Sequence, residues 1–231
     1  MRFALVGQPN CGKSTLFNQV AGYKAETGNF TGTTVTFTES KVRVLGEVVE
    51  LVDLPGTYTM AASNPAEREV LRYLSFNPVD VIINVLDASH LAQSLNLTME
   101  VLELGRPTVV ALNMMDEAAR FGMSLDGPKL QQLLEVPVLP LIASKGRGVK
   151  AVFTAALHAA RDGRIPPRPK YSLDLENIAI DLAAQVDQKI GSLGKTSLAI
   201  KLLEGDNDLL ARAQEKNPDL KSKVETAQIH I

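Results

Sequence analysis

Residues 7–18 read GQPNCGKSTLFN and follow directly on the apolar run FALV at residues 3–6. They match the pattern G-x-x-x-x-G-K-[ST], in which glycines let the backbone turn sharply and direct its N–H groups inward around an anion. The helix that follows adds its positive N-terminal end. Lys13 reaches the β- and γ-phosphates of a nucleotide, and the Ser14 hydroxyl can ligate Mg²⁺. The stretch therefore predicts a phosphate-binding loop between a buried strand and a helix. A glycine-rich turn that merely joins the two elements is the alternative, and the motif does not distinguish ATP from GTP.

A second motif, DLPG at residues 53–56, closes the apolar run VVELVDL. An aspartate at the end of that strand is placed to hold Mg²⁺ through water, as a Walker-B aspartate does. The bare backbone of Gly56 can then bring its N–H group close to a γ-phosphate. D-x-x-G alone is a weak signal, since many strands end in a polar turn. After a phosphate-binding loop, it predicts the metal side of the site.

A third motif, NMMD at residues 113–116, ends the predicted strand PTVVALNMMD. Guanine presents hydrogen-bond donors at N1 and N2, and one carboxylate can accept from both. Asp116 is the expected base contact, with Asn113 bracing the loop and the other edge of the base. An isolated N-x-x-D is also compatible with a polar strand end, and an ATP-binding site would require NMMD to be accidental.

The order of predicted elements indicates the fold class. Apolar runs alternate with helical patterns over most of the chain, which predicts an α/β fold with a mainly parallel sheet. TFTESKVRVL and EVVELVDL, on either side of Gly46, are close enough to form an antiparallel hairpin. The proline-rich connector RIPPRPK then introduces a region with only helical patterns. We therefore expect an α/β domain over residues 1–165 and a small all-helical domain over residues 166–231.

Charge and composition narrow the class of protein. The 231 residues are 45% hydrophobic and carry a net charge of −2, with 7 basic and 10 acidic side chains after residue 170. Neither part has the basic surface that nucleic-acid binding needs, so no nucleic-acid partner is expected. Cys11 is the single cysteine, which excludes an internal disulfide and fits a reducing compartment. No apolar run approaches the roughly 18 residues of a membrane span and no signal peptide is evident, so the chain as given is expected to be soluble.

The order of the three motifs resembles that of the Ras-like GTPases of the translation-factor type. In this resemblance ASKGRG at residues 143–148 takes the place of the fifth motif of that superfamily. Ala143, Ser144 and Lys145 would then support guanine through backbone N–H groups and the lysine stem. The family usually has serine at the first of these positions. The fold implied is a Ras-like P-loop GTPase, with a mostly parallel sheet that contains one antiparallel strand.

The segment GNFTGTTV at residues 28–35, with PNCGKSTLFN, DLPGTY and KLLEGD, resembles the bacterial ferrous iron transport protein B (FeoB) family over essentially the whole chain. The resemblance implies a cytosolic G domain followed by a helical, GDI-like spacer domain. It implies GTP/GDP and Mg²⁺ as cofactors, with Thr34 as the metal ligand of switch I. It further implies a membrane-embedded iron-permease domain in the same full-length protein. GTP hydrolysis would then take place on the cytoplasmic side of the inner membrane and control Fe²⁺ uptake. Small cytosolic regulatory partners and a homo-oligomer are left open.

Hydrolysis requires an oriented water and a positive charge near the γ-phosphate. Ras-like enzymes commonly place a glutamine after D-x-x-G, and this chain has Thr57 there, so slow intrinsic turnover is expected. Asn10 matches the asparagine that ligates K⁺ in potassium-activated members of the superfamily, where K⁺ would replace an arginine finger. The alternative is that its side chain stabilises the loop. Glu67 and Glu69 are expected to be solvated helix side chains, and Cys11 a small spacer rather than a reactive thiol.

These motifs define the expected site. The expected nucleotide contacts are Gly7, Gln8, Pro9, Asn10, Cys11, Gly12, Lys13, Ser14, Thr15, Gly32, Thr33, Thr34, Asp53, Leu54, Pro55, Gly56, Asn113, Met114, Asp116, Ala143, Ser144 and Lys145. Hydrolysis is expected to use Lys13, Thr34, Gly56 and Asn10. The expected metal ligands are Ser14, Thr34 and Asp53 for Mg²⁺, and Asn10 for K⁺. Two other functions stay open: a soluble GTPase of the ribosome-assembly or RNA-modification type, and a nucleotide-gated switch module with little catalysis.

Overall fold

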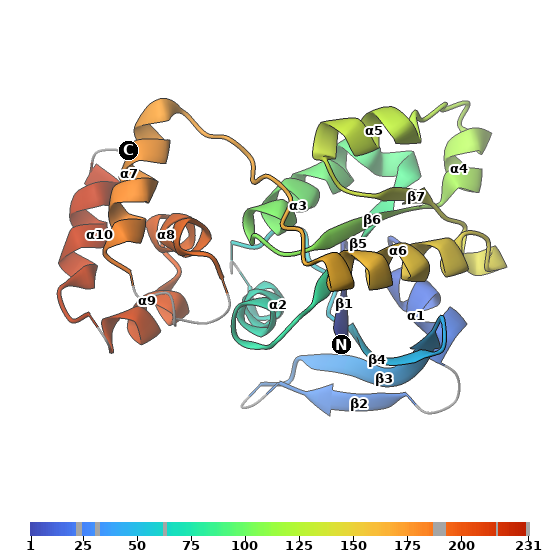
Figure 1. Ribbon diagram of the computed structural model, residues 1–231, viewed down its shortest axis with the longest axis horizontal. Coiled ribbons are helices and arrows are strands. Elements are labelled where there is room, and N and C mark those ends of the chain that lie inside the picture. Colours follow the sequence, from blue (N-terminus) through green and yellow to red (C-terminus); the bar gives the residue numbers. More distant parts are fainter. Residues whose placement is uncertain (22–24, 31–32, 62–63, 187–192, 216, 230–231) are drawn as a thin grey trace.

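One mixed sheet organises the larger part of the molecule. The computed structural model of the chain describes residues 1–21, 25–30, 33–61, 64–186, 193–215 and 217–229. Seven strands form the sheet in the order β2-β3-β4-β1-β5-β6-β7 (Figure 1). They are β1 Arg2–Gly7, β2 Glu26–Asn29, β3 Thr36–Val44, β4 Glu47–Asp53, β5 Val81–Asp87, β6 Thr108–Asn113 and β7 Val138–Pro140. Only the pairs that include β3 are antiparallel, so a single strand of the sheet runs against the others and the predicted fold class is confirmed.

Helices cover both faces of this sheet. They are α1 Lys13–Ala21, α2 Pro65–Phe76, α3 Leu91–Glu103, α4 Met115–Arg120, α5 Gly127–Leu134 and α6 Val149–Asp162, with the 3-10 turns η1 Ala88–His90 and η2 Ala143–Lys145. The apolar sides of α1 and α6, for example Leu16 and Phe153, pack on one face of the sheet. Those of α2 and α3, for example Leu74 and Val101, pack on the other face. The carboxyl ends of β1, β4, β5 and β6 meet at one edge between these layers, which is where open parallel sheets bind ligands.

Most predicted elements agree with the structure, and the exceptions are local. Asn64 caps α2, since its side-chain oxygen accepts from the Glu67 amide at 2.9 Å. The strand expected to reach Asp116 ends at Asn113 instead, because Met114 adopts a left-handed backbone (φ 61°) and α4 begins at the next residue. Strand β7 is also short and covers Val138–Pro140. Strand β2 was not predicted, since its sequence ETGN lacks apolar alternation and is a strand only through its pairing with β3.

Beyond residue 172 the described chain is helical, as predicted. The helices are α7 Leu173–Ala184, α8 Lys195–Leu203, α9 Asn207–Gln214 and α10 Leu220–Ile229, and they lie to one side of the sheet (Figure 1). Their buried side chains, among them Leu198 and Leu202, belong to the same apolar cluster as those of α2 and α3. The guanidinium group of Arg212 lies 3.8 Å from the ring centre of Phe76. The helical part therefore packs against the helix layer formed by α2 and α3.

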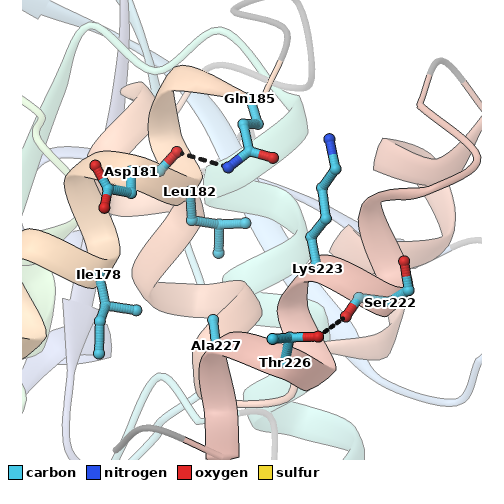
Figure 2. A pocket seen from close by; sticks show the side chains of 8 residues that line it. All are labelled: Ile178, Asp181, Leu182, Gln185, Ser222, Lys223, Thr226 and Ala227. Atoms are coloured by element: carbon cyan, nitrogen blue, oxygen red, sulfur yellow. Dashed lines mark hydrogen bonds between the residues drawn. The ribbon is translucent and has the colours of Figure 1, made fainter.

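A groove of about 330 Å³ runs between α7 and α10 (Figure 2). Its lining includes Ile178, Leu182 and Ala227, so part of its surface is apolar. Two polar side chains on its walls bond within their own helices, Gln185 Nε2 to a carbonyl oxygen of α7 at 3.1 Å and Thr226 Oγ1 to one of α10 at 2.8 Å. Among the described residues, no helix has the length and apolar composition that a bilayer crossing requires.

The buried carboxyl group of Glu103 lies where α3 meets the connector and α8. Burial raises its pKa to about 7, and the positive charges of Arg168 and Lys201 offset this only in part. The pKa of this carboxyl group is higher in the folded chain than in the unfolded chain. The folded chain therefore loses stability as the pH rises from the unfolded pKa to the folded pKa. We therefore expect Glu103→Gln to be about 1–2 kcal/mol more stable than wild type at pH 8, and no more stable at pH 4. Urea unfolding at the two pH values measures this, and an equal change at both would contradict it.

Candidate functional site

The loop between β1 and α1 depends on two left-handed residues. Gly12 has φ 86°, and a Cβ atom there would lie 2.2 Å from the side-chain nitrogen of Asn113. Asn10 has φ 65°, a backbone conformation that asparagine tolerates better than most residues. Gln8 ties the loop to α3 through a 2.9 Å hydrogen bond from its side-chain amide to the Gln93 carbonyl oxygen. The sequence of the loop thus sets a compact turn in front of α1, as the motif predicted.

Lys13 and Ser14 meet Asp53 across 40 and 39 residues of sequence, respectively. The ammonium group of Lys13 pairs with Oδ1 of Asp53, and the two side chains are only 8% and 9% exposed. The Ser14 hydroxyl donates to Oδ2 of the same carboxylate at 2.7 Å. One ammonium group, one hydroxyl and one carboxylate therefore meet at the carboxyl ends of β1 and β4. The oxygen donors of Ser14 and Asp53 form a set that suits Mg²⁺, and they are close enough to share one ion.

The D-x-x-G segment runs alongside the loop and is hydrogen-bonded to it. The Leu54 amide donates to the Leu5 carbonyl oxygen at 3.3 Å, and the Thr57 amide donates to that of Gly7 at 3.1 Å. At Gly56, a Cβ atom would lie 3.0 Å from the backbone of Pro9, so a side chain there would push the two segments apart. Gly56 consequently reaches the rim of the phosphate end of the site, where its predicted role places it.

Asn113 joins two loops at the other end of the site. Its side-chain nitrogen donates to the Cys11 carbonyl oxygen at 2.8 Å, and its side-chain oxygen accepts from the Ala143 amide at 2.9 Å. It is 3% exposed, and both ends of its amide are used within the protein. This geometry agrees with the bracing part of its predicted role. It also places the side chain behind the loops rather than on a ligand's edge.

Replacing Asn113 with alanine is expected to leave two buried backbone groups unpaired and to separate the loops. Each unpaired group costs about 1–3 kcal/mol, so we expect a loss of about 2–4 kcal/mol of unfolding free energy and a weaker GDP affinity. Asn113→Asp is the comparison variant: it keeps the acceptor for the Ala143 amide, but it replaces the donor to the Cys11 carbonyl oxygen with a buried negative charge. Urea unfolding and GDP titration measure both effects. Stability equal to wild type in Asn113→Ala would contradict the bracing role.

Asp116 lies in the first turn of α4, two residues after the left-handed Met114. Its Oδ2 accepts from the ammonium group of Lys145 at 2.7 Å. This hydrogen bond lowers the pKa of Asp116, so the carboxyl group is ionised and oriented. Ionised carboxylate oxygens are acceptors only, which suits a base edge made of two donors. The lysine predicted to support the base with its stem also fixes the aspartate.

Two neighbouring cavities lie between Gly56 and Asp116. We call the cavity at Gly56 the phosphate end and the cavity at Asp116 the base end, after their predicted contacts. Their volumes are about 580 Å³ and about 150 Å³. Both are lined by Gly12, Thr15 and Met114, so they form one trough that runs from Gly56 to Asp116. The other lining residues are Gln8, Pro9, Asn10, Lys13 and Ser14 at the phosphate end, and Asn113, Glu117, Ile142 and Ser144 at the base end. Glu117 and Ile142 were not predicted, although each is adjacent in sequence to a residue that was.

Some predicted contacts lie away from the trough or outside the described residues. Gly32 lies outside the described residues. Thr33 bonds within its own turn, donating to the Phe30 carbonyl oxygen at 3.3 Å and accepting from the Val35 amide at 3.2 Å. Thr34 is exposed, and neither threonine lines the two cavities. The two threonines lie between β2 and β3, which pair antiparallel with each other.

The burial of four side chains bears on the roles expected for them. Burial raises the pKa of the Cys11 thiol to about 11, which keeps the thiol protonated at neutral pH. Glu67 and Glu69 were expected to be solvated and are instead 4% and 5% exposed, because α2 packs between the sheet and the helical part. Thr57 is 1% exposed, and its hydroxyl donates to the Thr59 carbonyl oxygen at 2.7 Å.

Comparison with known proteins identifies the family. The family described as ferrous iron transport protein B matches residues 1–156, and the FeoB cytosolic helical domain matches residues 171–231. The Fe(2+) transporter FeoB of Salmonella typhimurium is 36% identical over 100% of this chain, which covers 31% of that protein. A Fe(2+) transport protein A/FeoB fusion protein of Porphyromonas gingivalis is 35% identical over 90% of this chain and 26% of its own length. The chain thus spans less than a third of these curated relatives.

Solved structures of cytosolic regions agree with this result. A mutant of the S. thermophilus protein NFeoB bound to GDP superposes with a TM-score of 0.89 at 31% identity, covering 100% of this chain and 89% of the other. The cytosolic domain of the T. maritima FeoB iron transporter in a GMPPNP form gives 0.85 at 27% identity, covering 98% and 97%. The chain therefore belongs to the ferrous iron transport protein B family and comprises its G domain and its cytosolic helical domain.

Proposed function

We propose that this chain binds GTP in the trough and hydrolyses it to GDP and phosphate. The observation that carries the proposal is that two adjoining cavities have Lys13 and Ser14, both bonded to Asp53, at one end and the ionised Asp116 at the other. The guanine nucleotides named for the S. thermophilus and T. maritima relatives support the choice of base. The most direct test measures GTP hydrolysis against ATP hydrolysis, each with K⁺ and with Na⁺. Equal hydrolysis of the two nucleotides would contradict the proposal.

Each residue of the trough has a defined task in this mechanism. Loop amides and the Lys13 ammonium group hold the β- and γ-phosphates, and the Gly56 amide contacts the γ-phosphate. Ser14 and Asp53 would hold Mg²⁺, which neutralises charge between these phosphates when bound. Binding requires Lys13 to exchange the Asp53 carboxylate for phosphate oxygens. Thr34 would join the metal ligands only after its segment moves toward the trough.

Slow intrinsic turnover follows from the surroundings of Thr57. Its hydroxyl is already bonded to the Thr59 carbonyl oxygen, and its side chain is buried. Its donor is therefore used within the protein, and burial keeps its oxygen away from an attacking water. This feature also favours the second candidate function, a nucleotide-gated switch module with little catalysis of its own. A GTP turnover in KCl clearly above that of a Lys13→Ala protein would exclude this alternative.

A potassium ion held by Asn10 is proposed to supply the charge that speeds hydrolysis. Asn10 lines the phosphate end, and its left-handed backbone aims the loop into the cavity. We expect GTP turnover to be about tenfold faster in KCl than in NaCl at equal ionic strength, because a bound cation would act as an arginine finger does. Alanine would strain φ 65°, so Asn10→Gly is the cleaner variant. It should lose the K⁺ response while it keeps GDP affinity.

The control for this prediction is Asn10→Asp, which keeps a side-chain oxygen that can ligate a cation. It is expected to retain part of the K⁺ response. Equal wild-type rates in the two salts would contradict the prediction, and so would an unchanged response in Asn10→Gly.

In the full-length protein, we propose that GTP hydrolysis controls Fe²⁺ uptake from the cytoplasmic side of the inner membrane, next to a membrane-embedded iron-permease domain. The names of the curated relatives and the shared helical domain support this placement.

A division into a G domain of residues 1–165 and a spacer domain of residues 166–231 is supported by the absence of helix and strand from residues 163–172. Small cytosolic regulators and a homo-oligomer are further proposals. The net negative helical region supports the expectation of no nucleic-acid partner.

A further inference from the structure

The segment that follows the D-x-x-G motif is fixed by a side chain from α3. Thr59 Oγ1 donates a hydrogen bond to Glu100 Oε2 at 2.8 Å, and the backbone amide of Met60 donates to the same oxygen. The Met60 side chain is completely buried in the cluster shared by α2 and α3. Upstream, the Thr57 amide is bonded to the Gly7 carbonyl oxygen. The four residues after Gly56 are therefore held at both ends.

Glu100 itself lies outside the nucleotide trough. It is absent from the lining of both cavities and is half-buried on α3. One carboxylate oxygen accepts from two donors of a single turn, so Glu100 caps this turn as an acidic residue caps a helix. Hydrogen bonds to an ionised acceptor are stronger than bonds between neutral groups. The two contacts span 41 and 40 residues of sequence, and no motif indicates them.

We call the two hydrogen bonds from Thr59 and Met60 to Glu100 the anchor. The anchor matters because it lies close to Gly56, whose amide is the proposed contact of the γ-phosphate. Gly56 packs against Pro9 at the rim of the phosphate end, four residues before the anchored amide of Met60. Under the proposed function its amide contacts the γ-phosphate of GTP, whereas GDP has no group at that position. A fixed segment presents this amide without an entropic cost at binding. A loose segment would have to be ordered each time a triphosphate binds.

We propose that Glu100 is a positioning residue that holds the D-x-x-G segment ready for a third phosphate and thereby strengthens the binding of GTP without changing that of GDP. The inference rests on the proposed function, because it assigns a role within the same site. It predicts that losing the anchor weakens binding of triphosphates only. The base, the α- and β-phosphates and the loop amides are untouched by Glu100, so GDP affinity stays as it is.

The test compares Glu100→Ala with Glu100→Gln. The glutamine side-chain oxygen can accept from both donors, whereas alanine removes the acceptor. Affinities are measured for GDP and for a non-hydrolysable guanosine triphosphate with an imido bridge between the β- and γ-phosphorus atoms. For Glu100→Ala we expect about tenfold weaker binding of the triphosphate analogue and GDP binding within about twofold of wild type. Glu100→Gln should stay within about threefold for both nucleotides, and Asn96→Ala, an exposed change on the same helix, should match wild type.

The outcomes separate the positioning role from its alternatives. Equal weakening of both nucleotides in Glu100→Ala would mean that Glu100 only supports the fold. Tighter triphosphate binding by Glu100→Ala would mean that the anchor hinders the segment. Unchanged binding would mean that the anchor has no effect on the nucleotide. Each of these three results overturns the proposal. If Glu100→Ala does not fold, Thr59→Val removes one of the two bonds and should weaken the analogue about threefold, with GDP unchanged. A wild-type protein that fails to bind GDP would overturn the proposed function instead.

Discussion

Replacing Asp116 with asparagine is expected to weaken GDP binding by about a hundredfold or more. The ionised carboxylate accepts from N1 and N2 of guanine, and hydrogen bonds to charged groups are worth about 1.5–3 kcal/mol each. An asparagine side chain offers one acceptor and one donor, so it faces one of the two guanine donors with its own N–H group. Isothermal titration with GDP measures the loss.

The same variant should gain affinity for xanthosine diphosphate. Xanthine has a carbonyl oxygen at C2 in place of the amino group, and the asparagine N–H group can donate to it. The control is Asp162→Asn, an exposed carboxylate on α6, for which GDP affinity should equal that of wild type. If Asp116→Asn binds GDP as tightly as wild type, Asp116 does not contact the base.

Replacing Lys13 with alanine is expected to abolish measurable nucleotide binding and also to destabilise the protein without nucleotide. Lys13 neutralises Asp53 in a pair whose side chains are 8% and 9% exposed. Removing one partner of a buried pair leaves an uncompensated charge and costs about 3–5 kcal/mol. Urea unfolding in the absence of nucleotide measures the stability, and GDP titration measures the binding.

The double variant Lys13→Ala/Asp53→Asn separates the two effects. Neutralising Asp53 removes the unpaired charge, so we expect most of the lost stability to return, whereas nucleotide binding does not. The Ser14 hydroxyl can still donate to the side-chain oxygen of an asparagine at residue 53. Stability that stays low in the double variant would contradict the assigned role of the buried pair.

Features that depend on local sequence could be predicted. The loop before α1 was predicted because glycines, a lysine and a hydroxyl residue at fixed spacing have few other uses, and α2 because Asn64 and Pro65 are strong signals for a helix start. The three motifs also came together in one trough, because parallel strands end at the same edge of a sheet.

Features that depend on distant contacts could not be predicted. Strand β2 exists through its pairing with β3, and α4 is too short to show a helical period. The burial of Glu67 depends on helices that follow a hundred residues later. The bonds of Glu100 to the segment after D-x-x-G join residues about 40 positions apart, and neither partner belongs to a motif that requires the other.

Competition between GDP and ADP for the purified chain tests the central claim most directly. A fluorescent guanosine diphosphate is bound first, and each unlabelled nucleotide is then titrated against it. Since a site built to pair with polar base groups rejects a base that lacks them, we expect GDP to compete at least about a thousandfold better than ADP. Comparable competition by the two nucleotides would contradict the account, because Asp116 and the trough would then not recognise guanine.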